Sequence, residues 1–323
     1  MDLHNDSPFL ANVQVANFPG RPLVAAVIIK ATFDLAANGA LRPSAEPLPF
    51  VFDQGKTPFG EFHGELFFKK QGIDVCVLGS VRRSQPTRRA QVQLTVGRER
   101  RQLFVSGDRR WLSDGLGREL VPSAPEPFTE MPLSYERAYG GHAPYNGAPV
   151  PFSANPSGRG YYREQSQAEG QLLPNLEDDR SPPIQRWQQQ PRVAGWAPYP
   201  MFWELRANAS LDIDPVHGSL TKVHPSIFNH AHPDLTFPSL SAGELIRIDG
   251  LHEAPYALRV PPPPAHVRVR IGEHERAIVA AIDGVFLWTD ASKVVITQRA
   301  RFEYALHPEE IRHVTVSAVA QLQ

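Results

Sequence analysis

Apolar and polar residues alternate along much of the first 120 residues. The stretch 30–35 alternates at every position, which is typical of a strand with one buried face. The stretches 75–81 and 91–105 continue the pattern, and a polar turn at 97–101 divides the second into the two arms of a predicted hairpin. Because no sustained 3.6-residue period appears, we predict an antiparallel β lobe over residues 1–120.

The last part of the chain has the same two-residue period. Apolar and polar residues alternate over 267–272, and a longer strand is predicted over 293–304. Between them, Asp283-Gly284 separates two apolar runs, and this dipeptide favours two-residue hairpin turns because it tolerates positive φ. We therefore predict a β meander over 241–323, with a turn at Asp283 and Gly284.

Residues 121–240 lack a clear period and are rich in proline. Of the 32 prolines, 23 lie between Val121 and Pro264, and proline interrupts both helices and central strands. Three tryptophans in this segment supply apolar area that favours order. The predicted fold class is mainly β, with little helix. Two antiparallel, sandwich-like lobes are joined by a long, ordered, irregular coil within one compact unit.

The composition excludes several classes of protein. With 33 basic and 34 acidic residues, the chain has no overall attraction to nucleic acid or to an anionic membrane. The single cysteine, Cys76, excludes an internal disulfide framework, and its apolar surroundings predict a buried, unreactive thiol. No apolar run approaches the roughly 20 residues of a transmembrane helix, and the first eight residues lack the basic start of a secretory signal. We expect a cytoplasmic protein without membrane insertion.

Basic residues are concentrated in one stretch. Residues 82–118 contain ten arginines and three acidic residues. No aromatic residues alternate with these arginines as a base-stacking surface would require, so an acidic protein partner is favoured over nucleic acid. The candidate partner-binding residues are Arg98, Arg100, Arg101, Arg109, Arg110 and Trp111.

No catalytic motif is complete in this sequence. The best candidates for metal ligands are His224, His230, His232 and Asp234, because two histidines in a His-x-His pattern can point to the same side. Such spacing is a weak signal without further ligands. We therefore predict no catalytic residue, no metal and no cofactor, and a protein that is not an enzyme.

Polar residues, glycine and proline form an ordered series of motifs. The series comprises Gly107-Asp108-Arg109 with Trp111, 127–141, Asn155-Pro156 with Gly158-Arg159-Gly160, and Leu173-Pro174-Asn175 with Glu177. We interpret the polar residues as structural groups that form hydrogen bonds with buried backbone groups of the coil. Glu136 and Arg137 are interpreted as a charged pair that supports a turn at the double glycine. The residues so interpreted are Asp108, Glu136, Arg137, Gly140, Gly141, Asn155, Arg159, Asn175 and Glu177.

This ordered series resembles the bacterial family known as domain of unknown function 2169. The resemblance begins at Pro8-Phe9 and 30–34 and ends with Gly243-Glu244 and the 285–301 meander, so it covers nearly the whole chain. It implies a cytoplasmic bacterial adaptor or chaperone that binds a type VI secretion effector and helps load it onto the secretion spike. The implied partners are the secreted effector and the spike protein, and no catalytic residue is carried over. Two alternatives stay open: a hydrolase acting on cell-wall or carbohydrate substrates through Glu136 or the His230/His232 group, and a structural component of the secretion machine.

Overall fold

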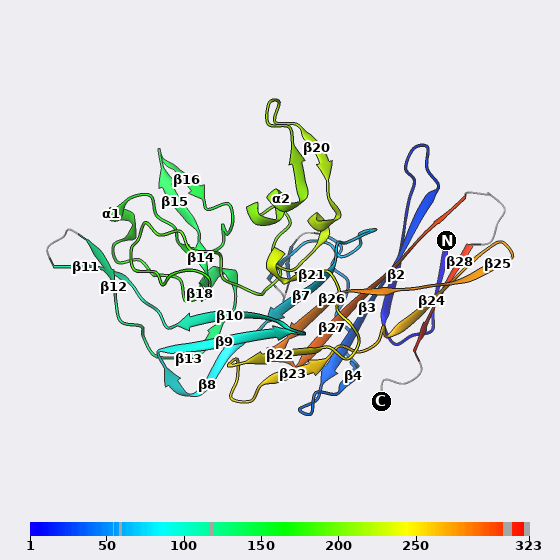
Figure 1. Ribbon diagram of the computed structural model, residues 1–323, viewed down its shortest axis with the longest axis horizontal. Coiled ribbons are helices and arrows are strands. Elements are labelled where there is room, and N and C mark those ends of the chain that lie inside the picture. The colour runs from blue at the N-terminus through cyan, green and yellow to red at the C-terminus, as the bar shows by residue number, and fades with distance from the viewer. Residues whose placement is uncertain (54, 58–59, 116–118, 306–311, 320–323) are drawn as a thin grey trace.

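A mixed β-sheet forms the centre of the protein (Figure 1). The computed structural model describes residues 1–53, 55–57, 60–115, 119–305 and 312–319, with only the backbone of 55–57 and 60–62. The sheet has the strand order β2 (Leu10–Ala16), β3 (Leu23–Leu35), β27 (Lys293–Tyr304), β26 (Ala281–Trp288), β7 (Ile73–Leu78) and β21 (Thr236–Phe237), and β4 (Leu41–Pro43) also pairs with β3.

Strands from the two ends of the chain alternate in this sheet. β27 pairs antiparallel with β3 along its whole length, from Lys293–Asp34 to Tyr304–Leu23. β26 lies parallel to β7 on the other side of β27. The segments 1–120 and 241–323 are therefore joined by main-chain hydrogen bonds within one sheet.

Two further sheets extend the same core. One has the order β18 (Leu176–Asp178), β10 (Glu99–Ser106), β9 (Arg89–Val96), β22 (Leu245–Asp249) and β23 (Tyr256–Arg259). The other has the order β1 (Asp2–Asn5), β28 (Arg312–Ala318), β24 (Ala265–Ile271) and β25 (His274–Ile278). Apolar side chains from all three sheets form one continuous buried cluster.

The rest of the described chain consists of short elements. The strands are β5 (Gly55–Thr57), β6 (Gly60–Phe62), β8 (Ser80–Thr87), β11 (Trp111–Ser113), β12 (Leu120–Pro122), β13 (Phe128–Pro132), β14 (Tyr139–Gly140), β15 (His142–Tyr145), β16 (Ala148–Pro151), β17 (Arg159–Gly160), β19 (Leu211–Ile213) and β20 (Leu220–Val223). The helices are α1 (Gln165–Ala168), α2 (Glu204–Ser210) and the 3₁₀ turns Tyr135–Arg137, Pro225–Phe228, Pro233–Leu235 and Thr289–Ala291. The predicted mainly β fold with little helix is confirmed. Within the described ranges, no helix has the length and apolar character needed to cross a membrane.

Small aromatic cores order the proline-rich middle segment. One contains Tyr135, Tyr199 and Trp203, whose rings pack edge to face at centroid distances of 5.1 to 5.5 Å. Another surrounds Trp111 and Leu173. Buried aromatic area thus stabilises the backbone where proline prevents regular hydrogen-bond ladders.

Two local predictions are wrong. Asp283 and Gly284 do not form a hairpin turn but lie inside β26, at a β-bulge opposite Thr297. Asp283 is buried because its carboxylate accepts hydrogen bonds from Thr297 (2.6 Å) and Arg299 (2.7 Å), so the local turn preference of the dipeptide is overridden. The stretch 30–35 is also not half-buried. Lys30 is buried on the face opposite Phe33, because its ammonium group has an ion-pair partner in the interior.

Candidate functional site

Three of the polar motif residues meet around the Asp108 carboxylate. The Asn175 side-chain amide donates to Asp108 (2.9 Å) and to the Ser106 carbonyl (3.0 Å). The guanidinium groups of Arg137 and Arg159 lie 3.5 and 3.8 Å from the same Asp108 carboxylate. Asp108 therefore connects three segments of the coil. The predicted pairing of Arg137 with Glu136 is not the one observed, because Arg137 points to Asp108.

Glu136 contributes its backbone rather than its side chain to this network. Its carbonyl accepts a hydrogen bond from Arg159 Nε (3.0 Å), and its side chain is exposed. Arg159 thus donates a hydrogen bond to a backbone carbonyl of the coil, which is the role that was expected for it.

The double glycine lies where no side chain fits. Gly140 and Gly141 have φ values of +152° and +99°. A Cβ atom would lie 2.1 Å from the Asn155 carbonyl oxygen at the first glycine and 2.6 Å from the Gly158 carbonyl oxygen at the second. The buried Asn155 amide donates to the carbonyl groups of Tyr135 (2.9 Å) and Tyr139 (3.0 Å). These residues therefore hold the turn together through backbone contacts.

Two of the candidate partner-binding residues are buried. Arg109 forms an ion pair with Glu177 (2.5 Å) and donates to the Pro174 carbonyl (2.9 Å). Trp111 is 1% exposed and packs with Leu120. Both residues are consequently part of the interior and not of an accessible surface.

The other four candidate arginines do not form one patch. Arg98 and Arg100 are exposed at the tip of the β9–β10 hairpin, where the two-residue turn Gly97-Arg98 confirms the predicted hairpin. Arg101 is half-buried and pairs with Glu99 (3.1 Å). Arg110 is exposed near β11 and donates to a carbonyl group of the coil. The exposed candidate arginines therefore lie at two separate places, the β9–β10 tip and the region near β11.

The candidate metal ligands are separated in space and have other partners. His224 lies 3.1 Å from Asp212 across the β19–β20 hairpin, whereas the His230 ring is buried and stacks on another histidine ring. His232 begins a 3₁₀ turn and accepts a hydrogen bond from the Asp234 amide (3.2 Å), and the Asp234 carboxylate pairs with two arginines. In the part of the chain that the structure describes, no three His, Cys, Asp or Glu residues form a metal-binding group.

A buried charged cluster lies at the start of β7. Asp74 accepts hydrogen bonds from the Lys70 ammonium (2.9 Å), the Asn229 amide (2.9 Å) and the His230 backbone amide (2.8 Å). Burial lowers the pKa of His63 to about 4 and that of His230 well below its usual value, so both rings are neutral at pH 7. The cluster attaches the 229–232 segment to the central sheet.

A second buried ion pair joins Lys30 to Glu65 at 2.6 Å. Burial lowers the pKa of Lys30, and the Glu65 carboxylate opposes that effect. The thiol of Cys76, on β7, is also fully buried, and burial raises its pKa well above the usual value. The thiol is thus protonated and enclosed, as the prediction of an unreactive cysteine requires.

An arm, residues 202–223, projects from the body of the protein (Figure 1). It consists of α2 and the β19–β20 hairpin, and every residue of β20 is exposed. Six large apolar side chains on the arm have exposed fractions of 36% to 81%: Phe202, Leu205, Ile213, Val216, Leu220 and Val223. Ile213 and Leu220 are paired across the hairpin and lie on one face of it. Exposed apolar side chains that share a face are typical of protein-binding surfaces. In the sequence, the only signal of the arm is a set of apolar residues that interrupt a run of turn-forming residues.

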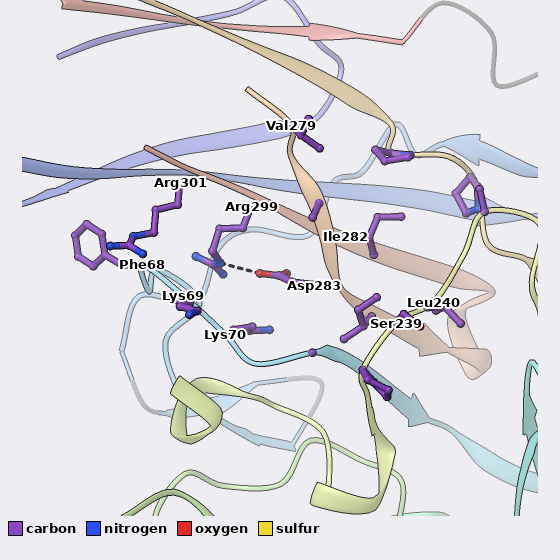
Figure 2. Close-up of a pocket in the computed structure, with 17 residues that line it drawn as sticks. Phe68, Lys69, Lys70, Ser239, Leu240, Val279, Ile282, Asp283, Arg299 and Arg301 are labelled. Atoms are coloured by element: carbon purple, nitrogen blue, oxygen red, sulfur yellow. Dashed lines mark hydrogen bonds and ion pairs between the residues drawn. The ribbon is translucent and has the colours of Figure 1, made fainter. Parts of the chain in front are cut away.

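A cavity of about 590 Å³ opens beside the first residues of β26 (Figure 2). Its walls come from the 68–73 segment, the 238–242 segment, two prolines before β24, and strands β26 and β27. Burial alone would raise the pKa of Asp283 in its wall, but the charges of Lys70 and Arg299 hold that pKa below its usual value. The carboxylate is therefore ionised and already neutralised by Arg299. The cavity was not predicted from the sequence, because the segments that form its walls are far apart in the chain.

Comparison with known proteins gives one result. Residues 20–299 match the model of the family described as "Uncharacterized protein conserved in bacteria (DUF2169)". No curated protein and no solved structure matches the chain. The matched residues include β3, the Asp108 network, the arm and most of the cavity wall. Because the match extends over far more than half of the chain, this protein belongs to the DUF2169 family.

Proposed function

We propose that this protein is a cytoplasmic, non-enzymatic adaptor or chaperone. It binds one type VI secretion effector and helps load that effector onto the secretion spike. The proposal draws its biological context from the motif series that resembles the family. The structural observation that supports it is the arm.

The arm has the properties of a surface that a partner protein covers. A two-stranded hairpin has marginal stability in water by itself. The β19–β20 hairpin also exposes Ile213, Val216 and Leu220, each more than half exposed. Covering these side chains removes apolar area from water, which is the main favourable contribution in most protein associations.

The first experiment is deletion of the gene in its native bacterium, followed by analysis of all secreted effectors. Loss of a single effector from the medium is the expected result. Loss of every effector would instead indicate a structural component of the secretion machine. Unchanged export of all effectors would refute both roles and leave the hydrolase alternative.

The second experiment tests the arm by affinity purification of the tagged protein from the same host. We expect the effector to be recovered with the wild-type protein. With the double variant Val216→Asp/Leu220→Asp its recovery should fall at least about tenfold, because a loss of only about 1.4 kcal/mol of binding free energy weakens the affinity tenfold. Leu112→Asp is the matched control, since Leu112 is also an exposed apolar strand residue but lies on β11. Recovery of the effector with all three proteins would reject the arm, and recovery with none would reject the adaptor role.

A further inference from the structure

The cavity lies at a gap in the central sheet. β26 and β21 both pair with β7, on opposite sides of it. At the start of β7 the chain leaves the sheet at Gly72, which has φ +70° and whose Cβ position would lie 2.5 Å from the Phe237 carbonyl oxygen. β26 continues past this point through Ala281 and Ile282, and the chain after β21 continues past it through Pro238–Leu240. Residues of both extensions line the cavity.

Ideal sheet geometry gives this gap the width of one strand. Adjacent strands lie about 4.8 Å apart, so two strands that flank a third are about 9.6 Å apart. At the end of the sheet where β7 is absent, this spacing leaves room for one additional extended segment. Among the described residues, no strand pairs with Ala281 or Ile282 on the β7 side. Because Gly284 pairs with Asp74, Asp283 lies opposite Ile73, the first residue of β7. The main chain of β26 therefore presents an open edge of two residues, Ala281 and Ile282, about 7 Å long.

The two sides of the gap differ in chemistry. Figure 2 shows Asp283 pointing toward Arg299, on the side where Lys69 and Arg301 also lie. Ile282 points the other way, toward Leu240. A strand that entered the gap would place successive side chains on opposite faces, so that one set would meet cationic groups and the other set apolar groups.

We propose that this gap binds an extended segment of a partner protein in which acidic and apolar side chains alternate. The segment adds a short strand to the open edge of β26, with its carboxylates toward Lys69 and Arg301 and its apolar side chains toward Ile282 and Leu240. This inference rests on the proposed function in that the partner is taken to be the effector. Strand addition to an open sheet edge is a recurrent mode of peptide recognition, in which main-chain hydrogen bonds give affinity and side-chain contacts give specificity.

Charge in the gap favours an acidic segment. Four cationic side chains and one carboxylate line the cavity. Lys70 is neutralised by Asp74 and Arg299 by Asp283, at 2.9 and 2.7 Å. Lys69 has no ion-pair partner among the residues that the structure describes.

Arg301 can also change its partner at little cost. It pairs with Glu303 at 3.2 Å, and both side chains are about half exposed. Exposed pairs of this kind contribute at most about 1 kcal/mol. The carboxylate of an incoming segment can therefore replace that of Glu303.

The test uses the full-length protein and a fluorescein-labelled nonapeptide in which glutamate and valine alternate. We expect saturable binding by fluorescence anisotropy, with a Kd on the order of 10 μM. The double variant Lys69→Glu/Arg301→Glu should weaken binding at least about tenfold, because it places like charges together. Arg268→Glu is the matched control. Arg268 is an exposed arginine on β24 and lies 3.7 Å from the Glu275 carboxylate. Reversing its charge should leave the affinity for the peptide unchanged.

Two further peptides separate strand addition from general charge attraction. A peptide with lysine in place of glutamate should not bind, and a peptide with a central proline should lose affinity because proline cannot donate a main-chain hydrogen bond. The proposal is overturned if no saturable binding of the glutamate peptide occurs, if the lysine peptide binds equally well, or if the double variant binds as the wild type does.

Affinity purification from the native host distinguishes this inference from the proposed function. If the effector is recovered equally with the wild-type protein and with Lys69→Glu/Arg301→Glu, the adaptor role stands and the gap is not where the effector binds. If the peptide binds but no effector is recovered with either protein, the gap is a peptide site and the adaptor role fails.

Discussion

His232 is predicted to make the stability of this protein depend on pH in the mildly acidic range. The ring is buried at the start of the 3₁₀ turn Pro233–Leu235, and its Nδ1 accepts a hydrogen bond from the Asp234 amide at 3.2 Å. An imidazole accepts a hydrogen bond only when that nitrogen is unprotonated. Burial lowers the pKa of His232 to about 4, against the opposing charge of Asp234. The folded protein therefore requires the neutral ring.

The magnitude follows from linkage between protonation and folding. The unfolded chain takes up a proton near pH 6.5, whereas the folded chain does so only near pH 4. Stability from this group is complete above pH 6.5, is lost as pH falls from 6.5 to 4, and stays constant below 4. A shift of about 2.5 units at about 1.36 kcal/mol per unit gives a total loss of about 3 kcal/mol. Within the window, the slope is at most about 1.4 kcal/mol per pH unit.

The assay is urea unfolding at several pH values between 4 and 7, with tryptophan fluorescence as the probe of the folded state. The substitution His232→Asn keeps a side-chain acceptor at the start of the turn but removes the titrating ring. We expect the free energy of unfolding of the variant to depend less steeply on pH, by up to about 1.4 kcal/mol per unit between pH 4 and 6.5. His63 titrates in the same window, so a residual slope should persist.

A second substitution separates titration from the hydrogen bond. His232→Phe also removes the titrating ring, and in addition it lacks the acceptor, which should lower stability by about 0.5–2 kcal/mol at every pH. Both variants should show the same reduced slope. Equal slopes in the wild type and both variants would refute the reasoning, because His232 would then titrate alike in the folded and unfolded chains.

Three further substitutions test the interior. For each, the free energy of unfolding is measured in urea with circular dichroism as the probe. Lys30→Met should cost about 3–5 kcal/mol because it leaves the Glu65 carboxylate buried without its partner, and adding Glu65→Leu should restore most of the loss; no recovery in the double variant would contradict this. Gly140→Ala should destabilise by at least about 1–3 kcal/mol, since its Cβ would collide with the Asn155 carbonyl oxygen, and a wild-type midpoint would count against that geometry. Trp111→Ala should cost about 3–5 kcal/mol if the ring is a core residue, whereas a change below 1 kcal/mol would indicate an exposed ring.

Strands were well predicted where the two-residue period is long. The expected strand over 293–304 coincides with β27, and the expected hairpin over 91–105 corresponds to β9 and β10. The period appears in the sequence because side chains on the two faces of a strand meet different environments. Phe302 and Tyr304 of β27 are buried, whereas Arg301 and Glu303 between them are exposed.

Predictions failed where distant residues decide the local environment. Lys30 looked solvent-facing, but it is buried because Glu65, 35 residues away, neutralises its charge. Asp283-Gly284 looked like a turn, but Thr297 and Arg299 on the neighbouring strand hold the aspartate inside β26. Trp111 looked available to a partner, but the coil folds over it. None of these partners can be assigned from local pattern or spacing.

The sequence by itself determined the mainly β class, the position of the longest strands and the burial of Cys76, because each depends on the residue types within a few positions. Only the tertiary structure decided which strands are neighbours. It places β26 and β27 between β3 and β7, projects the arm, and leaves a gap at the start of β7. Strand neighbours depend on contacts between residues more than 200 positions apart, and such contacts have no local signature. The surfaces proposed to bind a partner therefore emerge only when the chain is folded.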